Sequence, residues 1–390
     1  MNIDTSRAVA ILMDLLRLAG VSGAEAPVAD YIIRAARKAG VKPGWIKRDR
    51  AHLKSPVKGN AGNLIIRLPG TRPGRAGMFS AHIDKVAIAA GCVPVRRGNT
   101  IRPQGATALG GDDRSGTGVL LVTLENLLKH RVDHPPLVFL FTVQEEIGLF
   151  GSRYVDRALL GRPAWCYNFD GRLPNQASLQ APSAAAFTAV IHGLAAHAGQ
   201  HPDRGISAAL IFADALMAVK RQGLYGEVRR GGRKAGTSNV GVIGGGSATN
   251  VVMDRLTVQG EARAYSAALL KHILAAYRTA FERAARRHRN AAGRTGRVTF
   301  TVTETYRTFD VPRTAPAVRR LTAALKGMGL APEFPTGFGG LDANWFNSYG
   351  IPTVTLGAGE RDPHTPAETQ DIPDYLEACR LALRLAAAPV

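Results

Sequence analysis

The stretch LVFLFTVQEEIGLFG, residues 137–151, decides the fold class, because a continuous apolar run ends directly in two adjacent glutamates. Two other stretches have the same form: AGMFSAHID, residues 76–84, and AWCYNFD, residues 164–170. Short apolar runs of this kind are typical of strands buried on both faces of a sheet. In open α/β sheets the carboxyl ends of the strands converge on the active crevice. We therefore predict an α/β protein with acidic and histidine side chains at that edge.

The pattern of helices and strands divides the chain into three segments. Residues 1–176 alternate helical and strand patterns, and this α/β pattern resumes over residues 309–390. Residues 177–308 instead follow the order β-α-β-β-α-β, with helical stretches over 205–222 and 267–288. That order is typical of a compact, ferredoxin-like α+β unit. We therefore predict a catalytic domain in two pieces with a smaller domain inserted between them.

Composition excludes several classes of protein. The chain has 390 residues, of which 45% are hydrophobic and 21% charged, so neither a disordered nor a fibrous protein fits. No apolar run approaches the roughly 18 residues that a membrane span needs, and charges interrupt the apolar pattern of residues 1–20. Cys92, Cys166 and Cys379 lie far apart and form no disulfide framework. We therefore expect a cytoplasmic protein without a membrane partner.

The positive charge of the chain is concentrated locally. There are 50 Lys and Arg against 30 Asp and Glu, a net charge of +20. Seven arginines and one acid lie within residues 278–297. A non-catalytic nucleic-acid-binding protein is therefore an alternative. Because the arginines alternate with alanine, Tyr277 and Phe281 at helical spacing, we interpret them as a solvated helix face and do not expect nucleic acid as a partner.

Acids and histidines cluster where predicted strands and a glycine-rich loop end. The set is His82, Asp84, Asp112, Asp113, Glu145, Glu146, Asp170 and His364. So many carboxylates cannot share one crevice without compensating charge, because like charges and burial both oppose ionisation. Imidazole and carboxylate without thiol suit Zn, Co or Mn, and the excess of carboxylates favours two ions about 3.5 to 4 Å apart with one bridging carboxylate. We therefore predict a dinuclear metal centre.

Two short motifs indicate different roles for residues within this set. In His82-Ile83-Asp84, an extended backbone points both polar side chains the same way, so Asp84 can orient the imidazole. The side chains of Glu145 and Glu146 diverge because the residues are adjacent. One glutamate can therefore bind metal while the other acts as general base for a water.

A series of motifs in a fixed order carries a family resemblance. In sequence they are SAHIDKV, GGDDRSG, VQEEIGLFG, NFDG, HAGQHPDRGISA, TNVVMD, GEARA, GGLDANWFNSYGIPTVTLGAG and PHTPAE. Together they resemble the metallopeptidase family that contains peptidase T, bacterial glutamate carboxypeptidase, succinyl-diaminopimelate desuccinylase and the aminoacylases, and most of all its peptidase T-like branch. The resemblance implies a zinc-exopeptidase-like three-layer catalytic domain with a mixed central sheet, and an inserted lid and dimerisation domain.

The resemblance also implies how the metals are held. Asp112 matches the bridging aspartate of the family. His82 and Asp170 match the further ligands of one ion, and Glu146 and His364 match those of the other. Taken one at a time, a strand-end acid is more often a cap, and a single histidine is more often structural. The coincidence of strand-end position and motif order favours the metal-binding interpretation for all five.

Five further positions receive roles from the resemblance. Glu145 matches the general base that activates a metal-bridging water, and Asp84 matches the residue that orients the first histidine. His197 matches a histidine that reaches the partner subunit's site and stabilises the oxyanion, although it could simply pack in a tight turn. Asn250 and Arg263 match residues that grip the substrate carboxylate or carbonyl, whereas a strand-surface role for Arg263 is the alternative.

The sequence departs from the family pattern at two places. Lys85 stands where many relatives have threonine, and Arg114 replaces a common lysine. DDRSG and QEEIGLFGS also resemble a second family of dinuclear aminopeptidases that forms large hollow assemblies. That family inserts its extra domain soon after the HxD motif, whereas the insertion here follows Asp170 and contains HAGQHPDRG. The position of the insertion favours the first family.

We therefore predict a homodimeric metallopeptidase with two divalent ions per subunit, zinc in preference to cobalt or manganese. Its expected substrates are small peptides, cleaved by an exopeptidase similar to the tripeptide aminopeptidase peptidase T. An N-acyl amino acid deacylase and a carboxypeptidase of the same family remain alternatives. The choice depends on contacts to the substrate termini, which the sequence does not define.

Overall fold

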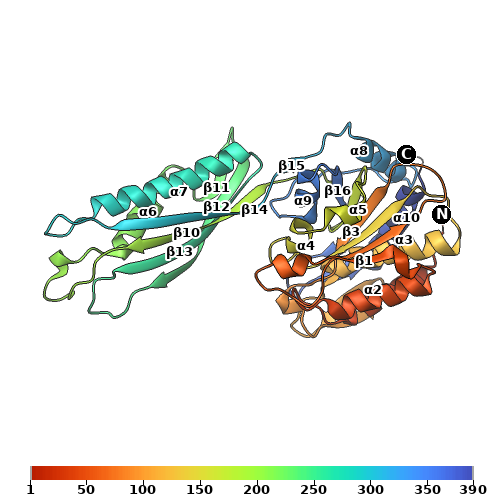
Figure 1. Cartoon of the computed structure of the whole chain (residues 1–390), viewed down its shortest axis with the longest axis horizontal. Coiled ribbons are helices and arrows are strands. Elements are labelled where there is room, and N and C mark those ends of the chain that lie inside the picture. The colour runs from red at the N-terminus through yellow and green to blue at the C-terminus, as the bar shows by residue number, and fades with distance from the viewer. Residues whose placement is uncertain (1, 389–390) are drawn as a thin grey trace. The chain divides into compact units, whose positions relative to one another are not determined.

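The computed structural model describes residues 2–388, which divide into two compact units (Figure 1). The larger unit comprises the residues up to Gln180, Asp310–Gly337 and the residues from Leu341 onward. The inserted unit comprises Ala181–Phe309 and Phe338–Gly340. The chain enters the inserted unit at β9 (Gln180–Ala181), leaves it at β15 (Phe309–Asp310) and returns to it briefly at Phe338–Gly340. These divisions lie close to the expected boundaries at 176/177 and 308/309.

A seven-stranded mixed sheet forms the centre of the larger unit, in the order β1-β2-β6-β3-β7-β16-β8. The neighbours β6, β3, β7 and β16 run parallel, whereas β1, β2 and β8 join antiparallel to their neighbours. The strands are β1 (Ile46–Arg48), β2 (Leu64–Leu68), β3 (Gly77–His82), β6 (Leu137–Thr142), β7 (Cys166–Phe169), β8 (Ala177–Ser178) and β16 (Thr353–Leu356). Every residue of β3, β6, β7 and β16 is buried, as their apolar runs predict.

Helices cover both faces of this sheet and complete the predicted three layers. On one face, α3 packs on the sheet and against α1, α2 and α10, and α8 packs on α10. The short helices α4, α5 and α9 lie on the other face, where Leu160 and Phe346 join the side chains of Met78 and Leu140 in one apolar cluster. The bounds are α1 (Thr5–Arg17), α2 (Ala26–Lys38), α3 (Gly111–Lys129), α4 (Phe150–Arg153), α5 (Arg157–Leu160), α8 (Pro316–Lys326), α9 (Asp342–Ser348) and α10 (Ile372–Ala387).

A small second sheet, in the order β17-β18-β5-β4, brings the last part of the chain beside an early hairpin. The strands are β4 (Val93–Arg97), β5 (Thr100–Gln104), β17 (Glu360–Arg361) and β18 (Thr369–Asp371). Antiparallel pairing of β17 with β18 closes the loop of residues 362–368. This loop carries one of the predicted metal-binding histidines.

The inserted unit is an antiparallel sheet in the order β11-β12-β13-β10-β14, with α6 and α7 packed on one face (Figure 1). Its elements are β10 (Ser183–His192), α6 (Ala208–Arg221), β11 (Gly226–Arg230), β12 (Arg233–Gly245), β13 (Arg255–Ala264), α7 (Ala267–Arg287) and β14 (Arg297–Tyr306). Phe187 lies at the centre of its core, with its ring 4.6 Å from that of Tyr277 and 5.3 Å from that of Phe300.

Two features of the inserted unit differ from the expected β-α-β-β-α-β order. A fifth strand, β11, pairs with β12 and lies at one edge of the sheet, because the basic segment around Gly231 and Gly232 turns as a hairpin. Phe338–Gly340 also joins this unit although it lies far along the chain. The Phe338 ring packs 5.0 Å from the ring of Tyr265, and Lys234 Nζ lies 4.2 Å from its centroid.

The described part of the chain has no helix long and apolar enough to cross a membrane.

Candidate active site

Asp112 lies between two groups of possible metal ligands. Its Oδ1 is 3.0 Å from Nε2 of His82, which is 3.9 Å from Oδ1 of Asp170. Its Oδ2 is 3.1 Å from Nε2 of His364, which is 3.0 Å from Oε1 of Glu146. Within each group the potential ligand atoms lie within 4.8 Å of one another. The five predicted metal ligands therefore come together, with one carboxylate oxygen of Asp112 directed to each group.

The topology of the sheet explains why these side chains meet. His82 ends β3, Asp170 follows β7 and Glu146 follows β6, and these three strands are parallel neighbours. Their carboxyl ends therefore lie along one edge of the sheet. Asp112 is in the first turn of α3, and His364 is in the loop between β17 and β18.

The chemistry of the donors fits divalent metal ions. Each group offers one imidazole nitrogen and two carboxylates, including the shared Asp112, a set that suits Zn, Co or Mn. Hydrogen bonds with Asp112 and Glu146 raise the pKa of His364 to about 10. Although burial opposes it, hydrogen bonds to Asp112 and Asp84 also hold the pKa of His82 well above its usual value. The site therefore strongly favours positive charge, which bound cations would provide.

Asp84 contacts both His82 and the backbone of the Glu145–Glu146 pair. The Nδ1 atom of His82 lies 3.2 Å from the main-chain oxygen of Asp84 and 3.4 Å from its Oδ1. The same carboxylate accepts hydrogen bonds from the backbone N–H groups of Glu145, at 3.0 Å, and Glu146, at 3.2 Å. A third bond comes from the hydroxyl of Ser22, at 2.6 Å. Asp84 thus contacts His82 and also holds the glutamate pair, a second role that its spacing did not predict.

Glu145 differs from its neighbour Glu146 in its surroundings. Neither group of ligand atoms includes Glu145, although it is buried close to both. Burial, together with the charges of Asp170 and Glu146, raises the pKa of Glu145 well above its usual value. A carboxylate with a raised pKa is suited to accept and return a proton near neutral pH.

Glu368 is a residue that the sequence reasoning missed. Its buried carboxylate accepts three backbone hydrogen bonds, from Gly111 at 2.7 Å, Gly110 at 2.9 Å and Asp112 at 3.2 Å. It therefore fixes the loop that presents Asp112. The available signal was its position in PHTPAE, four residues after His364.

Other buried acids also bind backbone instead of metal. Asp113, which we grouped with the converging acids, accepts from the N–H of His82 at 3.0 Å and of Gly116 at 2.9 Å. Glu25 accepts from the N–H of Gly23 at 2.8 Å and of Gln144 at 3.2 Å. These carboxylates hold the ends of β3 and β6 in place, and the sequence pattern does not distinguish them from ligands.

The two unusual basic residues support the N-terminal segment. Lys85 is buried and its Nζ donates to the carbonyl of Leu16 at 3.3 Å. Arg114 is also buried and donates to the carbonyl of Gly20 at 3.1 Å. Burial and the charge of Arg114 lower the pKa of Lys85 to about 8. Both departures from the family pattern therefore involve packing behind the site.

The three remaining predicted site residues belong to the inserted unit. His197 is exposed, and its Nδ1 accepts from the N–H groups of Gly199 and Gln200, both at 3.2 Å. Asn250 lies nearby, since its carbonyl accepts from the N–H of Ala198 at 2.9 Å. Arg263, on β13, donates to both carboxylate oxygens of Glu261 at 3.0 Å and to the carbonyl of Phe338 at 2.9 Å.

Residues 78–388 match Peptidase family M20/M25/M40. The chain belongs to this family. A Bacillus subtilis (strain 168) protein called "Uncharacterized protein YqjE" is 30% identical over 83% of this chain and 84% of its own length. The solved aminopeptidase PepT from Bacillus cereus ATCC 10987 has a TM-score of 0.87 and 27% identity, and a tripeptidase from Staphylococcus aureus subsp. aureus Mu50 has a TM-score of 0.88 and 27% identity. Each alignment covers 99% of this chain and 98% of the other.

Membership of the M20 family decides between the predicted classes. The protein is a metallopeptidase that hydrolyses peptide bonds, and the predicted resemblance to peptidase T and the predicted α/β fold are confirmed. The alternative of a non-catalytic nucleic-acid-binding protein is therefore wrong. The second family of dinuclear aminopeptidases, suggested by DDRSG, is set aside for the same reason.

Proposed function

We propose that this M20 peptidase is an aminopeptidase that removes the first residue of small peptides, tripeptides above all. The observation that supports this most is its similarity to the Bacillus cereus aminopeptidase and the Staphylococcus aureus tripeptidase over 99% of the chain. This similarity covers both the catalytic and the inserted unit.

In the proposed mechanism, Glu145 accepts a proton from the attacking water and returns it to the leaving amine. Two divalent cations, which we propose are zinc, would supply the Lewis acidity that polarises the scissile carbonyl. His82, Asp112, Glu146, Asp170 and His364 would hold them. Asp84 keeps the His82 ring and the backbone of Glu145 in position through its hydrogen bonds.

The bridging role of Asp112 has a direct test in metal content. Replacing Asp112 with alanine removes the carboxylate that both groups of ligands share, so we expect both ions to be lost together. Elemental analysis of the purified variant against wild type measures this and also identifies the metal. Two ions per chain retained in Asp112→Ala would contradict the bridging role.

Substrates with blocked ends separate the three candidate activities. Metal-loaded enzyme is given one tripeptide in three forms: unmodified, N-acetylated and C-amidated, together with an N-acetyl amino acid. An aminopeptidase releases the first residue of the unmodified and C-amidated forms and leaves the N-acetylated form intact. Release of the last residue from the N-acetylated form would instead establish a carboxypeptidase, and cleavage of the N-acetyl amino acid a deacylase.

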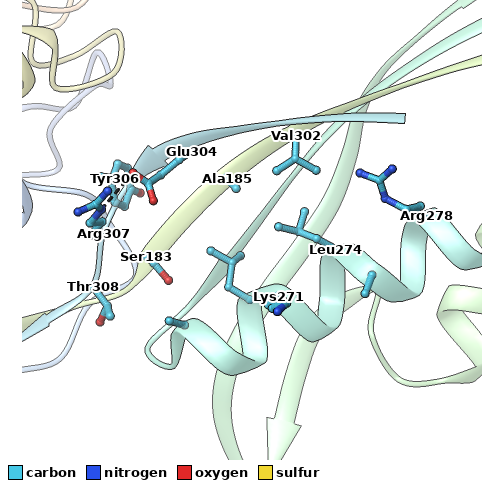
Figure 2. Close-up of a pocket in the computed structure, with 13 residues that line it drawn as sticks. Ser183, Ala185, Lys271, Leu274, Arg278, Val302, Glu304, Tyr306, Arg307 and Thr308 are labelled. Atoms are coloured by element: carbon cyan, nitrogen blue, oxygen red, sulfur yellow. Dashed lines mark hydrogen bonds and ion pairs between the residues drawn. The ribbon is translucent and has the colours of Figure 1, made fainter. Parts of the chain in front are cut away.

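We also propose that the protein acts as a homodimer paired through the inserted unit. This unit exposes aliphatic side chains such as Val242, Ile243 and Val302, which cost free energy in water. A largely apolar groove of about 730 Å³ lies between α7 and the edge strand β14. Leu274 and Val302 lie along it (Figure 2). Edge strands and apolar grooves of this kind are suited to pairing with another chain.

Within such a dimer, His197 would donate a hydrogen bond to the oxyanion in the partner's site, and Asn250 and Arg263 would bind the substrate carboxylate or carbonyl. For Arg263 this role requires an exchange of partners, because its guanidinium is held by Glu261.

We further propose a cytoplasmic location. All three cysteines are free and buried, as expected in a reducing compartment.

A further inference from the structure

The larger unit has a cavity that lies away from the metal ligands. It has a volume of about 540 Å³, within the range of small-molecule sites. Helix α5 and three loops form it: one loop before β3, one between α5 and β7, and one between α9 and β16. The loops before β3 and β7 are at the amino ends of the strands whose carboxyl ends lead to His82 and Asp170. The cavity is therefore at the opposite edge of the sheet from the metal centre, since β3 alone spans six residues, about 20 Å.

Three arginines line this cavity, and a fourth lies beside it. Arg75, Arg157 and Arg162 line it, and the Arg67 guanidinium lies against Gly161 in the same loop, 2.7 Å from where a Cβ would be. The lining includes no acidic side chain. Within residues 2–388, none of the four arginines forms an ion pair with a carboxylate. The arrangement therefore concentrates positive charge that the chain itself leaves uncompensated.

The floor of the cavity is apolar and well fixed. Leu160, Pro163 and Ile351 line it and are buried. Tyr349 forms one wall, and its hydroxyl donates to the carbonyl of Arg153 at 2.6 Å, which sets the orientation of the ring. The Arg157 guanidinium lies 5.0 Å from the centroid of this ring. A cationic rim over an apolar and aromatic floor matches a ligand that is anionic at one end and apolar or planar at the other.

We propose that this cavity binds a phosphorylated small molecule of nucleotide size. The arginine rim would hold its phosphate groups, because the planar guanidinium donates paired hydrogen bonds to phosphate oxygens. The apolar floor and Tyr349 would receive its planar part. This site is separate from the hydrolytic centre, so the proposal does not depend on which peptide bond the enzyme cleaves.

A basic groove in the inserted unit provides a matched control. Arg221 on α6 and Arg283 and Arg287 on α7 line a groove of about 520 Å³ in the inserted unit. Its lining includes Asp214, which pairs with His288 at 2.8 Å, and mostly alanine and polar side chains. Three arginines line it, as in the proposed site, but its lining has no Phe, Tyr or Trp side chain and no apolar side chain larger than alanine. Replacing these three arginines changes the net charge of the protein by the same amount as replacing Arg75, Arg157 and Arg162, but leaves the proposed site intact.

Calorimetric titration of the full, metal-loaded protein at 150 mM NaCl tests the proposal with ADP, pyrophosphate and adenosine as probes. We expect ADP to bind at one site per chain, pyrophosphate to bind more weakly, and adenosine alone to show no saturable binding. Absence of saturable binding by both ADP and pyrophosphate would overturn the proposal.

Two triple variants then locate the binding. Combined Arg75→Gln, Arg157→Gln and Arg162→Gln should weaken ADP binding roughly 30-fold or more, and Arg157→Gln alone about tenfold, since each removes charged hydrogen bonds. Combined Arg221→Gln, Arg283→Gln and Arg287→Gln should leave it within about twofold. Equal weakening in both would indicate general attraction to a basic protein. Unchanged binding in both would assign ADP to the metal centre, and either result would overturn the proposal.

Discussion

Glu145 and Glu146 are adjacent and chemically identical, yet their surroundings suit different tasks. Glu146 lies 3.0 Å from His364 within a group of ligand atoms, whereas Glu145 stands outside both groups with a raised pKa. We expect Glu145→Gln to abolish turnover while metal content and unfolding temperature stay near wild type, because only the proton acceptor is lost. Glu146→Gln should lower metal affinity. Elemental analysis with steady-state kinetics distinguishes them, and equal metal loss in both variants would reverse the assignment.

Glu25 gives a prediction about pH. Burial and the nearby charge of Asp84 raise the pKa of Glu25 from an ordinary 4.5 to about 7. The folded protein therefore binds this proton more tightly than the unfolded chain does. The stabilising effect is complete below about pH 4.5 and is lost as the pH rises through 7.

Glu25→Gln should remove this dependence. The amide keeps an oxygen for the N–H groups of Gly23 and Gln144 but does not ionise. We expect the loss of unfolding free energy between about pH 5 and 8 to shrink by about 1 to 3 kcal/mol relative to wild type. Denaturant titrations across this range measure it, with Glu227→Gln on the exposed surface of β11 as control. An identical pH profile for Glu25→Gln and wild type would contradict the assignment.

Among the structural elements, the start of α3 and the loop between β17 and β18 are joined by one side chain. Glu368 accepts three backbone N–H groups at residues 110–112, four residues beyond His364. It therefore connects the segment that presents Asp112 to the segment that presents His364. A glutamine at this position can accept with only one of its two terminal atoms, so the loop should lose part of its support.

Glu368→Gln should therefore weaken metal binding beyond any effect on stability. Asp49 offers a matched control, because its buried carboxylate also accepts three backbone N–H groups, from Ala51, Asn63 and Asp156. We expect cobalt titration, followed by absorption, to show at least about tenfold lower affinity in Glu368→Gln and little change in Asp49→Asn. Similar losses of unfolding free energy are expected in both. Equal metal affinity in the two variants would contradict the prediction and show that Glu368 contributes only to the stability of the fold.

For the whole molecule, the proposed dimer makes a prediction about mixed subunits. If His197 acts in the partner's site, His197→Ala and Glu145→Gln are each inactive, but a mixed pair contains one site with both groups intact. After random and complete exchange, activity should therefore return to about a quarter of wild type. Kinetic assays of the mixture measure this, and mass spectrometry verifies that mixed dimers formed. A mixture that stays inactive despite mixed dimers would show that His197 acts within its own chain or not at all.

The sequence by itself determined the α/β class, the inserted unit and the set of five metal-binding candidates. The class and the converging acids follow from local patterns, because a buried strand needs a continuous apolar run and its carboxyl end must point to the crevice. Asp112 and His364 lie outside the parallel strands, and the order of the family motifs assigned them as ligands together with His82, Glu146 and Asp170.

Tertiary structure alone decided what the remaining buried acids do. Asp113, Glu25 and Glu368 have the same side-chain chemistry as the ligands, but they face backbone N–H groups instead of imidazoles. The packing of Phe338 into the inserted unit and the arginine-lined cavity likewise depend on segments far apart in sequence. The physical reason is that hydrogen-bond partners and enclosed volumes depend on which segments meet. The hydrophobic periodicity within one segment does not predict which distant segment it will contact.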